Sequence, residues 1–472
     1  MTISTYKSEL EVPVPVDQLF SWHENPGAFE RLTPPFEPVK VKKRKGGIDG
    51  GEVHLQMNLG PIPLPWVARH HDYIKNEQFL DEQVRGPFAS WNHAHLFEKI
   101  DAKSSKLIDK IDYKLPFGTV GSTFGGAFAE QKIKQMFAYR RNITKNDLVS
   151  QSKYSGSPLN IAVTGGSGLI GSQLKPYLTT AGHSVENIVR GRPQKGELSW
   201  NLENRTMSNL SGKDVVVHLA GEPISKPLGG MIPLPWTKWK RNEILKSRVE
   251  GTKLISEHIA SLNNPPKVMI CASAVGYYGD RGEDLLSESE KSGDDYFSHV
   301  VSEWEKAAQP AIDAGIRVVF LRIAPVMSPL GGALQVLGNA ARLGSSPPVA
   351  GGKQWWSWIS LDDVVDVIYH SIINEKLSGP VNVASPNPVR QKEWASTLAK
   401  VIWGRFGPLT GLIPVPGFAL KTVLGEFGDV LALSSIKIDS SKLLDSGYKF
   451  RFENLEDCFR HLLGKRTEEE LQ

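Results

Sequence analysis

The sequence predicts an α/β protein whose main part is a doubly wound parallel sheet, preceded by a smaller α+β domain. The chain has 472 residues, too many for one ordinary hydrophobic core. From residue 159 onward, short runs of Val, Ile and Leu alternate with stretches of helical periodicity, which is typical of parallel strands covered by helices on both faces. Before residue 150, extended stretches lie between Gly and Pro turns and end in one helical stretch, which indicates an antiparallel sheet closed by a helix.

The composition is that of an ordinary globular protein. Hydrophobic residues make up 40% of the chain and charged residues 22%, and the formal net charge is only +4, so neither nucleic acid nor a membrane is expected as the main partner. Cys271 and Cys458 are the only cysteines and lie far apart, which favours a reducing compartment over a disulfide framework. No leader-like segment or membrane-length apolar run is present, so we expect a cytoplasmic protein.

The first domain is expected to span residues 1–150, with a polar linker at 151–158. Helical periodicity covers Ala129–Ile143 near its end. The extended stretches expected before this helix are Val39–Val41, Glu52–Leu59, Val67–Tyr73 and Ser90–Phe97. Together they predict a curved antiparallel sheet packed on one long helix.

Four histidines of this domain, His70, His71, His93 and His95, raise the question of a metal site, because alternation places His93 and His95 on one face of a strand. No cysteine or acidic residue stands at ligand spacing among them except Asp72, which alternation places opposite His71. We therefore expect these histidines to line a cavity or to be satisfied in a core, and we expect no metal.

The second domain begins with Asn160–Gly171, which reads NIAVTGGSGLIG. An apolar run ends at Thr164, and Gly165, Gly168 and Gly171 then precede a helical pattern. This order predicts a strand, a tight turn and a helix N-terminus, the arrangement that lets a dinucleotide pyrophosphate approach bare backbone and free amides. An ordinary structural turn is the alternative interpretation.

Further apolar runs and helical stretches extend this pattern to about residue 404. The strands expected are Asn160–Thr164, Ser184–Arg190, Asp214–Leu219, Val268–Ser273, Ile316–Arg322 and Val381–Ala384. The longest helices expected are Lys238–Leu262 and Asp294–Ala314, the latter bent by Pro310. Residues 405–472 are expected to form a small helical domain that caps this sheet.

The residue after the second strand of this domain decides which dinucleotide is expected. NAD-binding domains place a carboxylate there, but this chain has Arg190 and Arg192, and a guanidinium at that point pairs with a 2′-phosphate. NADP(H) is therefore preferred over NAD(H). A solvated loop arginine is the alternative.

Several strings resemble one known family when they are taken together: TGGSGLIG, VHLAGEPI, RNEILKSRVEGT, SAVGYYG and WWSWISLDD. They resemble the atypical, epimerase-like branch of the extended short-chain dehydrogenase/reductases, which binds NADP on a Rossmann-like domain and has a small C-terminal domain. In residues 1–150, the strings WHENPGAFERLTPP, GPFASWNHAH and FAYR resemble a START-like (SRPBCC) helix-grip ligand-binding domain. The resemblance implies a Rossmann domain over 159–404 and an apolar ligand in the first domain.

The resemblance also implies the contacts that NADP(H) makes. The phosphates are expected at the loop and helix start, the 2′-phosphate at Arg190, the adenine near Leu219 and Ala220, and closure of the site by the helix after them. The residues implied are Gly165, Gly168, Leu169, Ile170 and Gly171 for the phosphates, and Glu243 and Arg248 for closure. Without the resemblance, Glu243 and Arg248 are read as an exposed pair on a helix.

The catalytic residues are where the sequence departs from the family pattern. The resemblance implies that Ser273 orients a substrate oxygen and that Tyr296 passes a proton, but Val300 stands where the family has a lysine that lowers the tyrosine pKa. An ordinary helix aromatic is the alternative interpretation of Tyr296. Tyr277 and Tyr278 are alternative proton carriers, or residues that pack beside the nicotinamide, and we include Tyr278 with Ser273 and Tyr296 among the candidate catalytic residues.

Three functions follow from these observations. The first is an NADP(H)-dependent oxidoreductase or epimerase acting on a small substrate through Ser273 and a tyrosine. The second is a sensor or scaffold that binds NADPH without a reaction, suggested by the missing lysine, with a hydrophobic ligand in the first domain. The third is a carrier of hydrophobic ligands that the nucleotide fold only stabilises.

Overall fold

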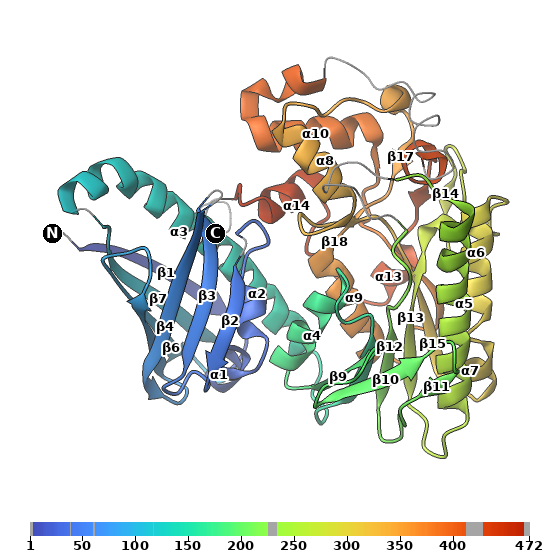
Figure 1. Ribbon diagram of the computed structural model, residues 1–472, viewed down its shortest axis with the longest axis horizontal. Coiled ribbons are helices and arrows are strands. Elements are labelled where there is room, and N and C mark those ends of the chain that lie inside the picture. The colour runs from blue at the N-terminus through green and yellow to red at the C-terminus, as the bar shows by residue number, and fades with distance from the viewer. Residues whose placement is uncertain are drawn as a thin grey trace. The chain divides into compact units, whose positions relative to one another are not determined.

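The computed structural model describes residues 3–37, 39–59, 62–116, 118–224, 234–411 and 428–466 (Figure 1). The chain divides into two compact units between Gly156 and Ser157, with Thr179–Gly182 and the residues from His461 grouped with the first unit. No helix in the described part of the chain is both long and apolar enough to cross a membrane.

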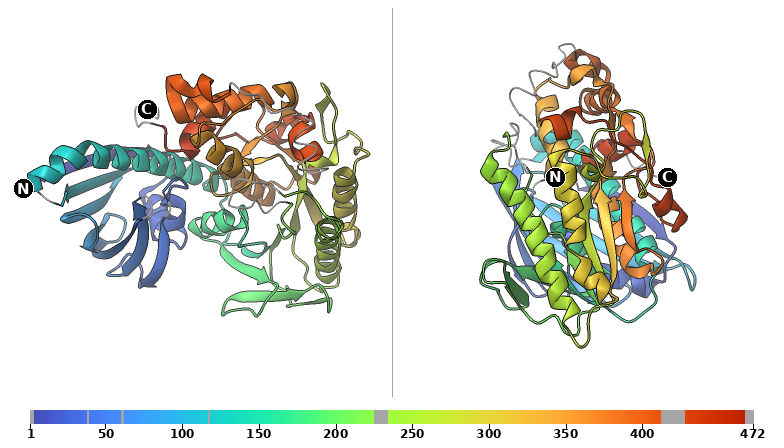
Figure 2. Two further views of the ribbon diagram at one scale, coloured as in Figure 1. Left: turned by 45° about the horizontal axis from the view of Figure 1, so that its top comes forward. Right: turned by 90° about the vertical axis from the view of Figure 1, so that its right-hand side faces the viewer.

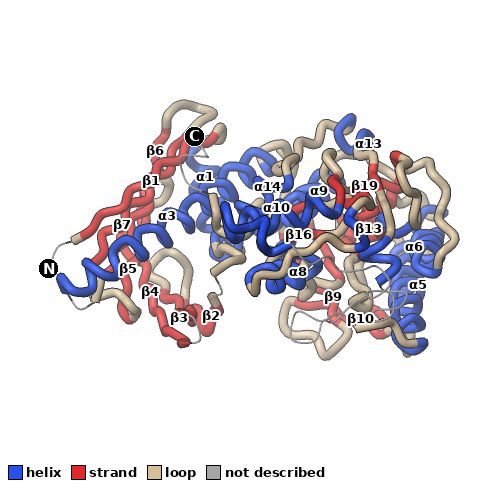
Figure 3. Tube along the Cα trace, turned by 90° about the horizontal axis from the view of Figure 1, so that it is seen from above, coloured by secondary structure: helices blue, strands red, loops and turns tan. Residues whose placement is uncertain are grey.

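The first unit is a seven-stranded antiparallel sheet with helices on one face (Figure 3). The strand order is β1-β7-β6-β5-β4-β3-β2. The strands are β1 Ser4–Val12, β2 Lys40–Lys45, β3 Glu52–Leu59, β4 Ile62–Ile74, β5 Gln78–Arg85, β6 Ser90–Lys99 and β7 Ser105–Lys114, and the helices are α1 Val16–Glu24, α2 Ala28–Leu32 and α3 Gly118–Gln151. The antiparallel sheet and long closing helix predicted from the sequence are therefore present.

Alternation in the strands builds the core of this unit. In β6, Trp91, His93, His95 and Phe97 are buried while their neighbours are more exposed, as expected for a sheet with one covered face. The α3 residue Phe137 packs into the same core. The face of β6 that holds His93 and His95 is thus the face that α3 covers.

Three strands, β1, β5 and β7, were not predicted, and α3 is longer than the expected helix. The sequences of β5 and β7, QFLDEQVR and SKLIDKIDYK, are rich in charge because half of their positions face away from the core. The start of α3, GTVGSTFGGAF, has low helix propensity because of its glycines. The helix also includes Gln151, the first residue of the expected linker.

The expectation that Asp72 lies opposite His71 is wrong. Asp72 has a φ of +50° at an irregularity in the pairing of β4 with β5, and this interrupts the alternation. Its carboxylate lies 3.0 Å from His71 Nδ1. The pair is exposed and faces solvent.

The second unit is an eight-stranded sheet in the order β11-β10-β9-β8-β12-β13-β15-β19, parallel except for β11 at the edge. The strands are β8 Asn160–Thr164, β9 Ser184–Val189, β10 Glu197–Asn201, β11 Thr206–Met207, β12 Val215–His218, β13 Val268–Ala274, β15 Arg317–Ile323 and β19 Gly379–Val383. The order reverses between β8 and β12, which is where a doubly wound sheet opens a crevice for a ligand. The Rossmann-like sheet predicted from the sequence is confirmed.

Helices cover both faces of this sheet (Figures 1 and 2). They include α4 Gly171–Thr180 and α9 Leu361–Ile373 on one face, and α5 Lys238–Ala260, α6 Tyr296–Lys306 and α7 Gln309–Asp313 on the other. The expected helix Asp294–Ala314 is in fact two helices. Asp295 caps α6, and Pro310 lies in the first turn of α7, where a proline costs no hydrogen bond.

The rest of the second unit is a set of short elements beyond the sheet. They are β14 Leu285–Leu286, β16 Val326–Met327, α8 Gly332–Arg342, β17 Trp355–Trp356, β18 Ile359–Ser360, β20 Val389–Arg390, α10 Gln391–Trp403, β21 Lys437–Ile438, α13 Ser441–Asp445 and α14 Leu455–Leu462. The last of these fall in the expected C-terminal helical domain, of which residues 412–427 lie outside the described residues.

Candidate functional site

The turn between β8 and α4 needs glycine for steric reasons. Gly165 has a φ of +72°, and a Cβ atom there would lie 2.8 Å from the carbonyl carbon of Leu219. A Cβ on Gly171 would lie 2.3 Å from the carbonyl oxygen of Gly165, and one on Gly168 would lie 3.2 Å from the same oxygen. The three glycines let the loop fold tightly against the end of β12.

The same turn presents free donors at a helix start. In the described part of the chain, the backbone amides of Leu169 and Ile170 have no hydrogen-bond acceptor. Gly171 begins α4, a helix of 10 residues, so its positive dipole end points at this loop. Free amides and the dipole together suit an anionic diphosphate.

A buried hydrogen-bond network fixes the position of Leu219 and Ala220. The hydroxyl oxygen of Thr164 accepts the amides of both residues at 3.2 Å and lies 2.7 Å from His218 Nδ1. His218 Nε2 lies 3.1 Å from Thr252 Oγ1. Burial, with help from the Arg248 charge, lowers the pKa of His218 to about 3, so the ring is neutral. The Thr164 hydroxyl then donates to Nδ1 and Nε2 donates to Thr252, which ties the ends of β8 and β12 together.

Arg190 follows β9, the strand next to β8, and its side chain is exposed. Neither Arg190 nor Arg192 has an ion pair or hydrogen bond within the described ranges. The carboxyl ends of β8 and β9 share one edge of the sheet. A cation without a partner therefore lies at the edge where the glycine turn stands.

Arg248 is buried, so the reading of Glu243 and Arg248 as an exposed pair is wrong. Arg248 Nη1 donates to the carbonyls of Glu222 and Ile244 at 3.0 and 3.2 Å, and its guanidinium lies 5.0 Å from the centre of the Trp304 ring. Burial lowers its pKa to about 10. Its Nε is buried and has no hydrogen-bond partner in the described part of the chain.

Ser273 lies at the end of β13, directly across from Arg322 on β15. Its hydroxyl donates to Glu305 Oε1 at 2.6 Å. Arg322 donates to both oxygens of Glu305, at 2.9 Å from Nε and 2.8 Å from Nη2. The hydroxyl proton of Ser273 is thus engaged, and the oxygen keeps its lone pairs to accept a hydrogen bond.

Tyr278 joins this network from the other side of Arg322. Its phenol accepts a hydrogen bond from Arg322 Nη1 at 3.0 Å and donates to Asn382 Oδ1 at 2.7 Å. The side chain is fully buried, and burial raises its pKa to about 12, although Arg322 acts to lower it. The neighbouring ring of Tyr277 packs against the Arg322 guanidinium, 3.5 Å from its centre.

Tyr296 is the first residue of α6, and its hydrogen bond is to α5 rather than to the network of Ser273 and Arg322. Its phenol donates to the carbonyl oxygen of Arg241 at 2.6 Å, and its ring lies 3.9 Å from the Arg241 guanidinium. Val300, at the position of the family lysine, is fully buried in the core between α5 and α6. The structure therefore connects Ser273 and Tyr278 through Arg322 and leaves Tyr296 outside that network.

Glu305, Arg322 and Asn382 were not predicted as site residues. The sequence could have indicated Arg322, because this charged residue interrupts the apolar strand sequence VVFLRI near its carboxyl end. Nothing in the sequence indicated Glu305 and Asn382, because their role depends on which strand and helix lie beside β13.

Comparisons with known proteins find two matching family models and a similar plant protein. Residues 161–384 match the model of the NAD dependent epimerase/dehydratase family, and residues 415–462 match a domain of unknown function, DUF1731. The chain is 31% identical over 333 residues to the "Epimerase family protein SDR39U1 homolog, chloroplastic" of Arabidopsis thaliana, covering 68% of this chain and 91% of the plant protein.

Two solved structures are similar as well. A crystal structure described as the nucleoside-diphosphate sugar epimerase from Corynebacterium glutamicum is 31% identical, with a TM-score of 0.79 over 98% of this chain and 91% of that one. The human epimerase family protein SDR39U1, solved with NADPH, is 28% identical, with a TM-score of 0.58 over 65% of this chain and 99% of that one.

Proposed function

The chain belongs to the NAD dependent epimerase/dehydratase family, with a C-terminal DUF1731 domain, and from this we propose that it is an NADP(H)-dependent oxidoreductase or epimerase acting on a small substrate. One observation is central to the proposal. The tight glycine turn has free amides, and an unpaired arginine follows the neighbouring strand. The NADPH in the human SDR39U1 structure supports NADP(H) at the level of the family.

The residues fit the cofactor in the following roles. The amides of Leu169 and Ile170 would hold the pyrophosphate, and Arg190 would pair with the 2′-phosphate. Leu219 and Ala220, held in place by Thr164, would lie along the adenine. Arg248 would complete the site through its unpaired Nε, with Glu243 beside it on α5. When bound, NADP(H) supplies a hydride donor or acceptor.

Ser273 is the residue that would contact the substrate oxygen. As it stands, its oxygen accepts a hydrogen bond from a substrate hydroxyl, because its own proton points at Glu305. A rotation about χ1 would free that proton for a substrate carbonyl. Arg322 neutralises Glu305 in both cases and keeps the carboxylate in place as the acceptor.

Calorimetric titration with NADPH and NADH tests the cofactor assignment. We expect Arg190→Ala to weaken NADPH binding roughly tenfold to a hundredfold, because it removes a charge-assisted pair, and to leave NADH binding unchanged. Lys195→Ala is the matched control, since it removes an exposed charge from the same loop. Equal affinity of the wild type for the two dinucleotides, or no heat with either, would contradict the assignment.

Turnover tests the catalytic assignment. A panel of nucleoside diphosphate sugars and simple carbonyl compounds is the starting point, because the structure from Corynebacterium glutamicum is described as a nucleoside-diphosphate sugar epimerase. With a compound that turns over, Ser273→Ala should abolish activity and leave NADPH affinity unchanged. Undiminished activity of Ser273→Ala would rule out the role of this hydroxyl.

A sensor or scaffold that binds NADPH without a reaction is the second candidate function. The hydrogen bonds of the two tyrosines favour this function, because neither phenol is free to pass a proton. Tyr278 is buried between Arg322 and Asn382, and Tyr296 donates to a backbone carbonyl. Val300 also stands where the family has a lysine. This function predicts that bound NADPH stays reduced with every compound of the panel. Oxidation of NADPH by any of them would favour the enzyme.

For the first unit we propose a START-like ligand-binding domain that accepts an apolar ligand. Such a ligand would enter between the sheet and α3, where a pocket with room for about one water molecule would have to widen. Leu10, Leu32, Leu107 and Phe137 line its apolar side. Its polar side is formed by His23, Asp109 and Arg140, which suits a ligand with one polar end. Native mass spectrometry of the full chain as purified tests it, and a mass that matches the bare chain with or without dinucleotide would contradict the proposal.

A further inference from the structure

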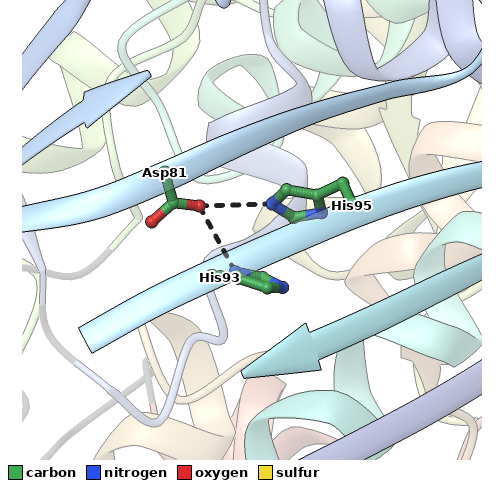
Figure 4. A group of neighbouring side chains, drawn as sticks. All are labelled: Asp81, His93 and His95. Atoms are coloured by element: carbon green, nitrogen blue, oxygen red, sulfur yellow. Dashed lines mark hydrogen bonds and ion pairs between the residues drawn. The ribbon is translucent and has the colours of Figure 1, made fainter. Parts of the chain in front are cut away.

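Four titratable side chains from three neighbouring strands meet on the covered face of the sheet of the first unit, and Figure 4 shows three of them, Asp81, His93 and His95. His93 and His95 come from β6, Asp81 from β5 and Asp109 from β7. The strand register places Asp81 beside His93 and Asp109 beside His95. We name these four residues the histidine cluster. The histidines are 3% and 8% exposed, so water does not satisfy their ring nitrogens.

Each imidazole of the histidine cluster turns one nitrogen to Asp81 and the other to Asp109. Asp81 Oδ2 lies 3.3 Å from His93 Nδ1 and 3.3 Å from His95 Nε2. Asp109 Oδ1 lies 3.0 Å from His93 Nε2 and 2.7 Å from His95 Nδ1. The contacts to Asp109 are therefore the shorter ones for both histidines.

The distances to Asp81 match those between ligands of one metal ion. In a tetrahedral zinc site with bonds of about 2.0–2.1 Å, two ligand atoms lie about 3.3–3.4 Å apart. A charge-assisted hydrogen bond between a ring nitrogen and a carboxylate is shorter, at about 2.7–2.9 Å. Asp81 Oδ2, His93 Nδ1 and His95 Nε2 all lie within 4.8 Å of one another, so one ion can reach all three.

We propose that Asp81, His93 and His95 bind one zinc ion, with a fourth position open to water or to a ligand of the adjoining pocket. Asp109 would be the positioning residue, because it accepts the proton of each opposite ring nitrogen and so directs both lone pairs at the metal. Zinc-binding histidines commonly donate their second nitrogen to a carboxylate in this way. His95 and Asp109 also line the small pocket of this unit, which has room for about one water molecule that could be the fourth ligand.

The expectation that these histidines bind no metal has one premise that is wrong. It rested on the lack of an acidic partner near the histidines in sequence, but Asp81 and Asp109 reach them across the sheet from the flanking strands. A metal-free ion cluster is the competing interpretation, in which a protonated His95 neutralises the carboxylates. Burial acts to lower the pKa of His95, but Asp109 and Asp81 outweigh it and raise the pKa to about 9.

Metal analysis of the full chain distinguishes a zinc site from a metal-free ion cluster. Protein stripped with chelator, incubated with zinc sulfate and desalted should retain about one equivalent of zinc by mass spectrometric metal analysis. Asp81→Asn and His93→Ala should retain less than about a tenth of that. His71→Ala is the matched control, because His71 is also paired with an aspartate but lies outside the cluster. It should keep the wild-type stoichiometry.

A second measurement needs no variant. Wild-type protein loaded with Co²⁺ should show the intense visible bands of a tetrahedral site with nitrogen and oxygen ligands, and zinc should displace them at one equivalent. A wild type that retains under a tenth of an equivalent of zinc and gives only the weak spectrum of hydrated Co²⁺ would overturn the proposal. So would a folded His93→Ala protein, as judged by circular dichroism, that binds zinc as the wild type does. Zinc binding at the histidine cluster is expected whether or not the second unit binds NADP(H).

Discussion

At the scale of single residues, the most consequential group of the second unit is the carboxylate of Glu305. It accepts hydrogen bonds from the hydroxyl of Ser273 and from two donors of Arg322, and its side chain is 13% exposed. A buried ion pair adds little net stability compared with apolar residues, but removing one partner leaves the other charge uncompensated. The pair is therefore better explained by its effect on Ser273 and Tyr278, both of which it orients.

The substitution Glu305→Gln tests how much stability is lost when one charge of this pair is left uncompensated. It leaves the guanidinium of Arg322 buried without a counter-charge, and we expect a loss of about 3–5 kcal/mol in the free energy of unfolding. Glu257→Gln is the matched control, because Glu257 makes an exposed pair with Arg205 and should cost less than about 1 kcal/mol. Urea unfolding, followed in the transition that NADPH shifts, provides the measurement. Equal losses in both variants would contradict the distinction.

His218 makes the second unit sensitive to acid. Its pKa is about 3 in the folded chain and 6.5 in an ordinary setting, chiefly because of burial. The unfolded chain therefore takes up the proton first, so the stability that depends on neutral His218 is complete above pH 6.5 and is lost as the pH falls from 6.5 toward 3. The slope expected from this one group is about 1.4 kcal/mol per pH unit.

Urea unfolding at several pH values checks this prediction. Below pH 6.5, the free energy of unfolding of His218→Gln should fall less steeply with decreasing pH than that of the wild type. The difference in slope should correspond to about one proton fewer taken up on unfolding. His299→Gln is the control, since His299 is exposed on α6 and should leave the slope unchanged. A wild-type slope that His218→Gln does not alter would show that His218 can be charged in the folded chain.

At the scale of elements, the turn between β8 and α4 sets a steric limit on cofactor binding. A methyl group on Gly171 would lie 2.3 Å from the carbonyl oxygen of Gly165, so Gly171→Ala must move the loop. We expect NADPH affinity to fall about tenfold or more, because the free amides would no longer point at one place. Gly191→Ala is the control: Gly191 is near Arg190 and has open space around its Cα. Unchanged NADPH affinity in Gly171→Ala would contradict the role of the turn.

The elements also show what the sequence could predict. The β8 turn and the parallel strands were predictable, because apolar runs buried on both faces and a glycine turn are local signals. Strands β5 and β7 were not, because their outward positions are charged and mask the alternation. The partners of Ser273 and of His93 could not be predicted either. Arg322, Asp81 and Asp109 lie beside them only because of the strand register, which the sequence does not show.

At the scale of the whole molecule, the division into two compact units predicts two unfolding transitions. The glycine turn and Arg190 belong to the second unit and the histidine cluster to the first, so each ligand should stabilise one transition. NADPH at one hundred times its dissociation constant should raise the free energy of unfolding of one transition by about 2.7 kcal/mol. Zinc removal should lower the midpoint of the other.

Differential scanning calorimetry of the full chain, with NADPH and with chelator in turn, distinguishes these effects. Arg190→Ala should remove the shift caused by NADPH and keep the shift caused by the chelator, while His93→Ala should do the reverse. This reciprocity follows because a ligand stabilises only the unit that binds it, provided that the units unfold independently. A single transition that moves as a whole with either ligand would show instead that the two units unfold as one cooperative body.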